Sequence, residues 1–114
     1  MEFKPNILVV CGKNKRRSRT AEHIFKNDSR FKIRSVGLSP KSERKISEKD
    51  ITWADLVFVM ERSHQHNVFD LYNYLRLPKI EVLDIPDEYE YLDEELILIL
   101  TGRMNDILRS TYNI

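Results

Sequence analysis

The strongest constraint on the fold of this chain comes from two short apolar runs, at residues 7–10 (Ile-Leu-Val-Val) and 56–60 (Leu-Val-Phe-Val-Met). Each run is apolar at every position rather than at every second one, which is typical of strands buried on both faces of a sheet. Residues 31–36 and 79–83 predict two further strands, and helical patterns separate these segments. The sequence therefore predicts an α/β fold, a three-layer sandwich whose four-stranded parallel sheet has helices on both faces.

Capping signals and apolar periodicity predict four helices. We expect Ser18 to be the N-cap of the first helix, and Ser47-Glu-Lys-Asp50 resembles a capping box at the start of the second. A polar helix is predicted to begin near Arg62 and to run into residues 71–75. From Leu92 onward, apolar residues recur at helical spacing and predict a long amphipathic C-terminal helix.

Size and composition indicate one globular domain spanning residues 1–114. The chain is 41% hydrophobic and 32% charged, and its formal net charge of +1 gives no general attraction to nucleic acid or membranes. No apolar run approaches the roughly 20 residues that a membrane helix needs. One cysteine and no visible secretory signal predict a reducing, cytoplasmic setting. His64 and His66 stand two positions apart on a helix and face different directions, so we expect neither a metal site nor a cofactor.

The only cysteine, Cys11, directly follows the first apolar run; five residues separate it from Arg17, and Ser18 comes next. A loop between a strand and a helix would bring the thiol, the guanidinium and backbone N–H groups around one small anion, because helix N-termini and arginine forks both bind phosphate oxygens. Nearby cations and a helix N-terminus also favour the thiolate, which is the reactive form of a cysteine. We expect the loop to bind phosphate through these further residues: Gly12, Lys13, Asn14, Lys15, Arg16 and Ser18.

Charge is distributed unevenly along the chain. Basic residues cluster around Cys11, and acidic residues crowd the stretch from Glu81 to Glu95. Ligands of open α/β sheets bind outside the carboxyl ends of the strands, where the Cys11 loop, residues 60–62 and the acidic stretch are predicted to meet. We therefore expect a basic and an acidic loop to face one another across a crevice. Two interpretations of Glu61 and Arg62 stay open: they touch the edge of this site, or, as we prefer, they are surface charge at a helix start.

This arrangement resembles the low-molecular-weight protein tyrosine phosphatase family, whose loop carries Cys-x5-Arg-Ser with an asparagine at the position of Asn14. The similarity continues along nearly the whole chain and in the same order. Residues 20–25 resemble the family's helix after the loop, residues 35–37 the end of its second strand, and residues 54–61 its central strand. Pro86-Asp87-Glu88-Tyr89 resembles its acid loop, which is usually Pro-Asp-Pro-Tyr.

The resemblance implies a two-step phosphatase reaction. Cys11 would attack phosphorus to form a phosphocysteine, while Arg17 and the loop amides would stabilise the equatorial oxygens. Asp87 would protonate the leaving group and then activate water. Asp84 is the alternative acid, because it lies only three residues before Asp87. Tyr89 would line the substrate site.

The chain also departs from the family pattern. It is shorter than the usual member, and the missing residues fall between Gly37 and Trp53, where the family has a loop that helps to wall the substrate pocket. Lys13 replaces a family glycine, and Arg16 replaces a common second cysteine, so Cys11 has no internal disulfide partner. The extra cations favour a more highly charged phosphate ester, unless their side chains point to solvent.

The leading hypothesis is a cytoplasmic cysteine-dependent phosphatase that hydrolyses phosphate monoesters, with a phosphotyrosine protein or a small aryl phosphate as substrate. Two alternatives stay open: a phosphate- or nucleic-acid-binding module without turnover, and a phosphocarrier in which a strand-end cysteine passes a phosphoryl group on. The low net charge and the lack of interleaved basic and aromatic residues argue against nucleic acid. A phosphocarrier needs neither Arg17 nor a downstream acid.

Overall fold

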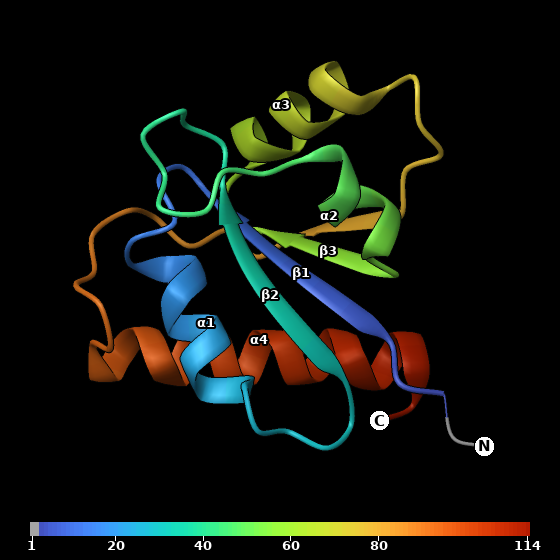
Figure 1. The fold of residues 1–114 in the computed structure, drawn as a ribbon. Helices are drawn as coiled ribbons and strands as arrows, with labels where there is room; N and C mark the ends of the chain where they lie inside the picture. The colour runs from blue at the N-terminus through green and yellow to red at the C-terminus, as the bar shows by residue number, and fades with distance from the viewer. Residues whose placement is uncertain (1–2) are drawn as a thin grey trace.

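The computed structural model describes residues 3–114 and contains strands and helices in strict alternation, which confirms the predicted α/β class. No helix within these residues combines the length and apolar character needed to cross a lipid bilayer. In chain order the elements are β1 (Asn6–Cys11), α1 (Arg17–Phe25), β2 (Lys32–Gly37), α2 (Glu48–Trp53), β3 (Leu56–Val59), α3 (Arg62–Tyr72), β4 (Lys79–Val82) and α4 (Glu94–Tyr112) (Figure 1).

The strands form one parallel, four-stranded sheet in the order β2-β1-β3-β4. β1 is central: Val9 pairs with Ser35 on β2 and with Phe58 on β3. Residues 7–10 are fully buried, which explains why this run is apolar at every position. The chain passes from β1 to β2 on one side of the sheet and reaches β3 on the other, so its direction reverses at β1. Ligands of open α/β sheets bind at such a switch point, and Cys11 ends the strand there.

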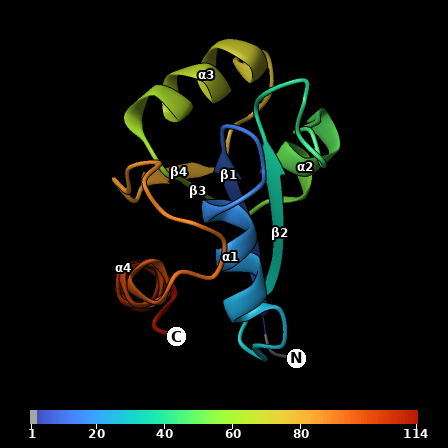
Figure 2. The same cartoon turned by 90° about the vertical axis from the view of Figure 1, so that its left-hand side faces the viewer.

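Helices cover both faces of the sheet, as predicted. Figures 1 and 2 show α2 and α3 on one face and α1 and α4 on the other. The side chains of β1 divide between two cores: Ile7 and Val9 pack on the α1 and α4 side, whereas Leu8 and Val10 pack on the α2 and α3 side. The apolar stripe of α4 completes the first core and confirms the amphipathic C-terminal helix; its buried members are Leu96, Leu100, Met104 and Leu108.

The start of α1 differs from the sequence-based prediction. α1 begins at Arg17 with Arg16 as its N-cap, so Ser18 does not cap the helix; it is buried, and its hydroxyl faces Cys11 instead. α3 spans Arg62–Tyr72, which confirms the prediction that it begins near Arg62 and runs into residues 71–75; beyond it, the Leu75 N–H bonds back to the Tyr72 carbonyl in a turn. The capping box at residues 47–50 is confirmed at the start of α2.

Candidate active site

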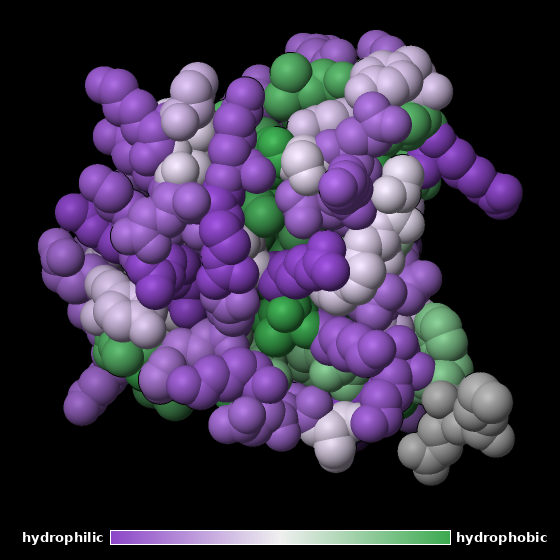
Figure 3. Space-filling model, in the orientation of Figure 1, coloured by the Kyte–Doolittle hydropathy of each residue, from purple (hydrophilic) through white to green (hydrophobic). Residues whose placement is uncertain are grey.

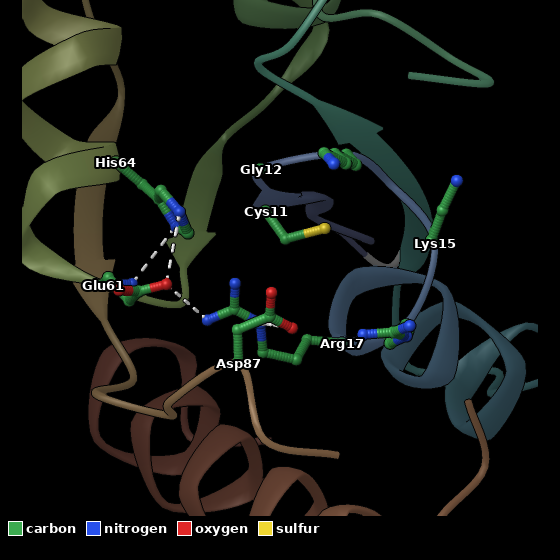
Figure 4. Close-up of a pocket in the computed structure, with 9 residues that line it drawn as sticks. Cys11, Gly12, Lys15, Arg17, Glu61, His64 and Asp87 are labelled. Carbon is green, nitrogen blue, oxygen red and sulfur yellow. Dashed lines mark hydrogen bonds and ion pairs between the residues drawn. The ribbon is translucent and has the colours of Figure 1, made fainter. Parts of the chain in front are cut away.

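Loops that follow β1, β3 and β4 meet at the carboxyl edge of the sheet around a pocket of ≈ 330 Å³. Backbone hydrogen bonds extend the sheet into these loops: Leu83 N–H donates to the Val59 carbonyl at 2.8 Å, and Ile85 N–H donates to the Met60 carbonyl at 2.9 Å. These bonds hold the loop after β4 beside the end of β3. The pocket in Figure 4 is lined by Cys11, Gly12, Lys13, Lys15, Arg16, Arg17, Glu61, His64 and Asp87.

The Cys11 thiol lies in a small hydrogen-bond network. Its sulfur is 2.9 Å from Ser18 Oγ and accepts the Asn14 backbone N–H at 3.1 Å. The Asn14 side-chain amide donates to the same Ser18 oxygen at 3.0 Å, which leaves the hydroxyl proton free to point at the sulfur. The Asn14 backbone N–H is thus aimed at the sulfur, and the Ser18 hydroxyl links the side chains of Cys11 and Asn14.

Asn14 makes this network possible through its backbone conformation. Its φ of 54° lies in the left-handed region, which asparagine tolerates better than most residues. The turn aims the Asn14 N–H back at Cys11, three positions earlier. Gly37 lies close by, and a Cβ added at Gly37 would be 2.7 Å from Asn14 N. The end of β2 thus needs a glycine for the loop to approach it.

Arg17 ties the loops together. Its side chain is 4% exposed, and its Nη1 donates to Glu61 Oε2 and to the Ile85 carbonyl, both at 2.7 Å. Arg17 Nε lies 3.7 Å from Asp87 Oδ1, and Figure 4 shows the two side chains together beneath Cys11. These contacts fix the guanidinium at the pocket, between the loops that follow β3 and β4.

Glu61 and His64 line the pocket, although surface charge is the preferred interpretation of Glu61 from the sequence and His64 is considered there only as half of a rejected metal pair. His64 is buried; its Nδ1 accepts the Glu61 N–H at 3.3 Å, and its Nε2 lies 3.6 Å from Glu61 Oε2. The hydrogen bond from Arg17 holds the pKa of Glu61 below its usual value. Burial, reinforced by the Arg17 charge, lowers the pKa of His64. Both residues follow β3 at the same sheet edge as Cys11, and this position is the signal that could have identified them.

Among residues 3–114, no group of three or more His, Cys, Asp or Glu side chains is arranged to hold a metal ion. His64 points into the pocket, whereas His66 is absent from the residues that line it, as expected for two positions on different sides of a helix.

The two candidate acids and Tyr89 occupy different places. Asp87 lines the pocket, with its side chain 58% exposed. Asp84 is exposed in a left-handed conformation, and its carbonyl accepts a hydrogen bond from Arg103 at 2.9 Å. Tyr89 is partly buried against the core on the α1 and α4 side. Within residues 3–114, neither Asp84 nor Tyr89 is among the residues that line the pocket, so the structure brings only Asp87 of the three to Arg17.

The predicted phosphate-binding loop is gathered at the pocket. Asn14 and Ser18 are fully buried beside Cys11. Arg16 Nε lies 3.6 Å from Glu90 Oε2, so the basic and the acidic loop meet as expected. The other members of the predicted set line the pocket itself: Gly12, Lys13, Lys15 and Arg16.

Together these features define a class of protein. The central strand of a parallel sheet ends in a cysteine at the switch point, and the helix that follows begins with an arginine. Backbone N–H groups, a helix N-terminus and a guanidinium are groups that bind small anions. The chain is therefore an α/β protein with a cysteine-bearing loop at the switch point of its sheet.

Solved structures place this class more narrowly. SP-PTP, a low molecular weight protein tyrosine phosphatase from Streptococcus pyogenes, matches with a TM-score of 0.78 at 19% identity, covering 96% of this chain and 93% of that one. Wzb from Vibrio vulnificus, in complex with benzylphosphonate, matches with a TM-score of 0.75 at 16% identity, covering 95% and 99%. DARP, a Drosophila arginine phosphatase, matches with a TM-score of 0.74 at 20% identity, covering 93% and 97%. The chain has the fold of the low-molecular-weight protein tyrosine phosphatases. No family model and no curated protein sequence matches it.

Proposed function

We propose that this protein is a cysteine-dependent phosphatase that hydrolyses phosphate monoesters through a phosphocysteine intermediate. The observation that carries the proposal is the placement of Cys11, Arg17 and Asp87 around one pocket, with Arg17 Nε 3.7 Å from Asp87 Oδ1. Asp87 lies on a different loop from the other two residues, so only the folded chain assembles the set. The phosphatases among the structural neighbours support the same function.

In the first step, the Cys11 thiolate attacks phosphorus and forms an S–P bond. The bond between phosphorus and the leaving oxygen breaks, and that oxygen takes a proton from Asp87. Arg17 and the loop N–H groups stabilise the charge on the equatorial phosphate oxygens, because they are already oriented before the reaction begins. The product of this step is phosphocysteine.

In the second step, water replaces the thiolate. Asp87, now a carboxylate, takes a proton from water, whose oxygen attacks phosphorus as the S–P bond breaks. Inorganic phosphate leaves, and the Cys11 thiolate and the Asp87 acid are restored. Glu61 takes no part in proton transfer in this scheme; it acts as a positioning residue that holds Arg17.

For the substrate, we propose a phosphorylated protein in the cytoplasm, with phosphotyrosine as the first candidate. The family resemblance and the tyrosine phosphatases among the neighbours support this choice. DARP is described as an arginine phosphatase. A phosphoarginine substrate would bring a guanidinium to the pocket, where Lys13, Lys15 and Arg16 would repel it. Charge therefore favours tyrosine over arginine.

The test is hydrolysis of p-nitrophenyl phosphate by the wild type and three variants. We expect vanadate-sensitive turnover by the wild type and none by Cys11→Ser. Asp87→Asn should lower kcat by about 10²–10⁴-fold, the range typical of general acid–base catalysis. Asp84→Asn is the matched control, because it makes the same chemical change three residues away and outside the pocket, and it should keep activity near that of the wild type.

Calorimetric titration of Cys11→Ser with inorganic phosphate shows whether that variant keeps its binding site. Turnover that survives Cys11→Ser, or an equal loss in Asp84→Asn and Asp87→Asn, would contradict the mechanism. Phosphate binding by the wild type without turnover would identify a binding module. A stable phosphocysteine that is released only to a second protein would identify a phosphocarrier.

A further inference from the structure

The pocket is lined by charge rather than by apolar surface. Apart from Cys11 and Gly12, every residue that lines it carries an acidic, basic or imidazole side chain, and no phenylalanine, tyrosine or tryptophan within residues 3–114 is among them. Aromatic leaving groups gain most of their binding energy from apolar and ring contacts. The pocket described here offers few such contacts, so recognition of the leaving group depends on electrostatics.

Cations gather on the loop between β1 and α1. We call Lys13, Lys15 and Arg16 the cationic rim, because all three are exposed and line the pocket. Figure 4 shows Lys15 on the opposite side of Cys11 from Glu61 and His64. Figure 3 shows a predominantly hydrophilic surface on the left, where Figure 1 places this loop and the loop between β4 and α4.

The two lysines of the rim differ from Arg16 and Arg17 in whether they have an acidic partner. Arg17 is held by Glu61 at 2.7 Å, and Arg16 lies 3.6 Å from Glu90. Within residues 3–114, neither Lys13 nor Lys15 has a carboxylate within ion-pair distance. Among the described residues, the rim therefore holds two cations without a carboxylate partner that can pair with a ligand, and Lys15 lies on the side of the pocket opposite Glu61 (Figure 4).

A single phosphate does not need these lysines at its reacting centre. Cys11 and Arg17 line the pocket and are only 3% and 4% exposed, whereas Lys13 and Lys15 line it from exposed positions. The leaving group of a phosphate ester that reaches Cys11 would therefore extend toward the lysines. A neutral leaving group gains nothing from two ammonium groups, and a cationic one is repelled. A leaving group with a negative charge of its own pairs with them directly.

We propose that the preferred substrate is a phosphate monoester whose leaving group carries a second anionic group, a phosphate or a carboxylate, which Lys13 and Lys15 bind. This proposal rests on the proposed phosphatase function and narrows its substrate class. Two sources can present that chemistry: a phosphotyrosine flanked by acidic residues in a protein, or a small bisphosphate. The reacting phosphate occupies the Cys11 loop in both cases, and the second anion lies over the rim.

The experiment compares substrates in matched pairs. One pair is a phosphotyrosine peptide flanked by glutamates and the same peptide flanked by glutamines; the other is fructose 1,6-bisphosphate and fructose 6-phosphate. Phosphate release gives kcat/KM for each. We expect the wild type to prefer the more anionic member of at least one pair by about 2- to 25-fold, or about 1.4- to 5-fold per lysine, the range of exposed ion pairs. The preference should fall when ionic strength rises from about 0.02 M to about 0.5 M.

Charge-removal variants locate the effect. Lys13→Met/Lys15→Met should lose most of the preference. Lys26→Met/Lys32→Met is the matched control: it removes the same net charge from exposed lysines at the end of α1 and the start of β2, and it should keep the preference. Preference within the peptide pair identifies a protein source, and preference within the sugar pair identifies a small molecule.

Two results overturn the proposal: equal kcat/KM within both pairs, or a preference that persists in Lys13→Met/Lys15→Met. Its failure is distinguishable from failure of the phosphatase function, because p-nitrophenyl phosphate has no second anion and reports the chemistry alone. If the wild type turns over none of these compounds, the phosphatase function fails. The same pairs are then titrated calorimetrically against Cys11→Ser, and the ratio of dissociation constants decides whether the rim selects a second anion.

Discussion

The hydrogen bond between Arg17 and Glu61 should contribute more to stability than an exposed ion pair of the same length. We predict that Glu61→Ala lowers the free energy of unfolding by about 1–2 kcal/mol. Hydrogen bonds to charged groups typically contribute about 1.5–3 kcal/mol, and the Arg17 side chain is only 4% exposed. The expected value is reduced because the Glu61 side chain is 42% exposed and water screens its charge.

The matched control is Glu43→Ala. Glu43 Oε2 accepts from Arg19 Nη1 at 2.6 Å, close to the 2.7 Å of the Arg17–Glu61 bond, but Arg19 is 37% exposed. Exposed pairs of this kind contribute about 0.2–1 kcal/mol, so we expect a loss at the low end of that range. Comparing the two variants thus separates the effect of burial on stability from the effect of hydrogen-bond length.

The assay is urea unfolding followed by circular dichroism, with a thermal scan as a second measurement. Glu61→Ala should lower the midpoint without changing the m-value, and it should lower Tm by about 4–8 °C. Equal losses of stability in Glu61→Ala and Glu43→Ala would refute the reasoning, because the burial of Arg17 would then contribute nothing. A changed m-value would mean that the substitution alters the compactness of the folded or the unfolded state, rather than removing a single contact.

Three further predictions concern pH and glycine. Burial lowers the pKa of folded His64, so below pH about 6.5 the unfolded chain takes up a proton at this residue that the folded chain does not, and the free energy of unfolding decreases as the pH is lowered. The difference in unfolding free energy between the wild type and His64→Gln should therefore change between pH 7.5 and 5; pH curves that stay parallel would contradict this. Gly37→Ala should destabilise the protein by about 1–3 kcal/mol in urea unfolding, because its Cβ would meet Asn14 N at 2.7 Å. Gly102→Ala in α4 should stabilise it by about 0.5–1 kcal/mol, because the site is open and alanine favours helix; a loss there would show that the space is not free.

Local sequence patterns predicted the secondary elements well, because each depends on neighbouring residues. Burial of β1 on both faces makes residues 7–10 apolar throughout, and the capping box at residues 47–50 is a contact within one helical turn. Ser18 shows the limit of such reasoning. Its type and position fit an N-cap, but its hydroxyl faces Cys11, seven positions earlier. A long-range contact thus replaced the local one.

Local patterns also failed to predict which side chains enter the pocket, because that depends on contacts between distant segments. Glu61 follows a strand and precedes a helix, which is equally typical of a solvated charge, and His64 gives no local signal of burial. Tyr89 sits in a segment that resembles an acid loop, yet it packs against the core on the α1 and α4 side. Which way each side chain turns depends on neighbours supplied by other elements.

The sequence by itself determined the α/β class and the composition of the loop from Cys11 to Ser18, because continuous apolar runs and a spacing of five residues are local properties. Only the tertiary structure decided what surrounds Arg17. Its hydrogen-bond partners Glu61 and Ile85 lie 44 and 68 positions away, and Asp87 rather than Asp84 turns toward it. These contacts depend on the strand order β2-β1-β3-β4, which brings the ends of β1, β3 and β4 to one edge. Periodicity within a segment carries no information about that order, since it reports which face a residue buries and not which strand lies beside it.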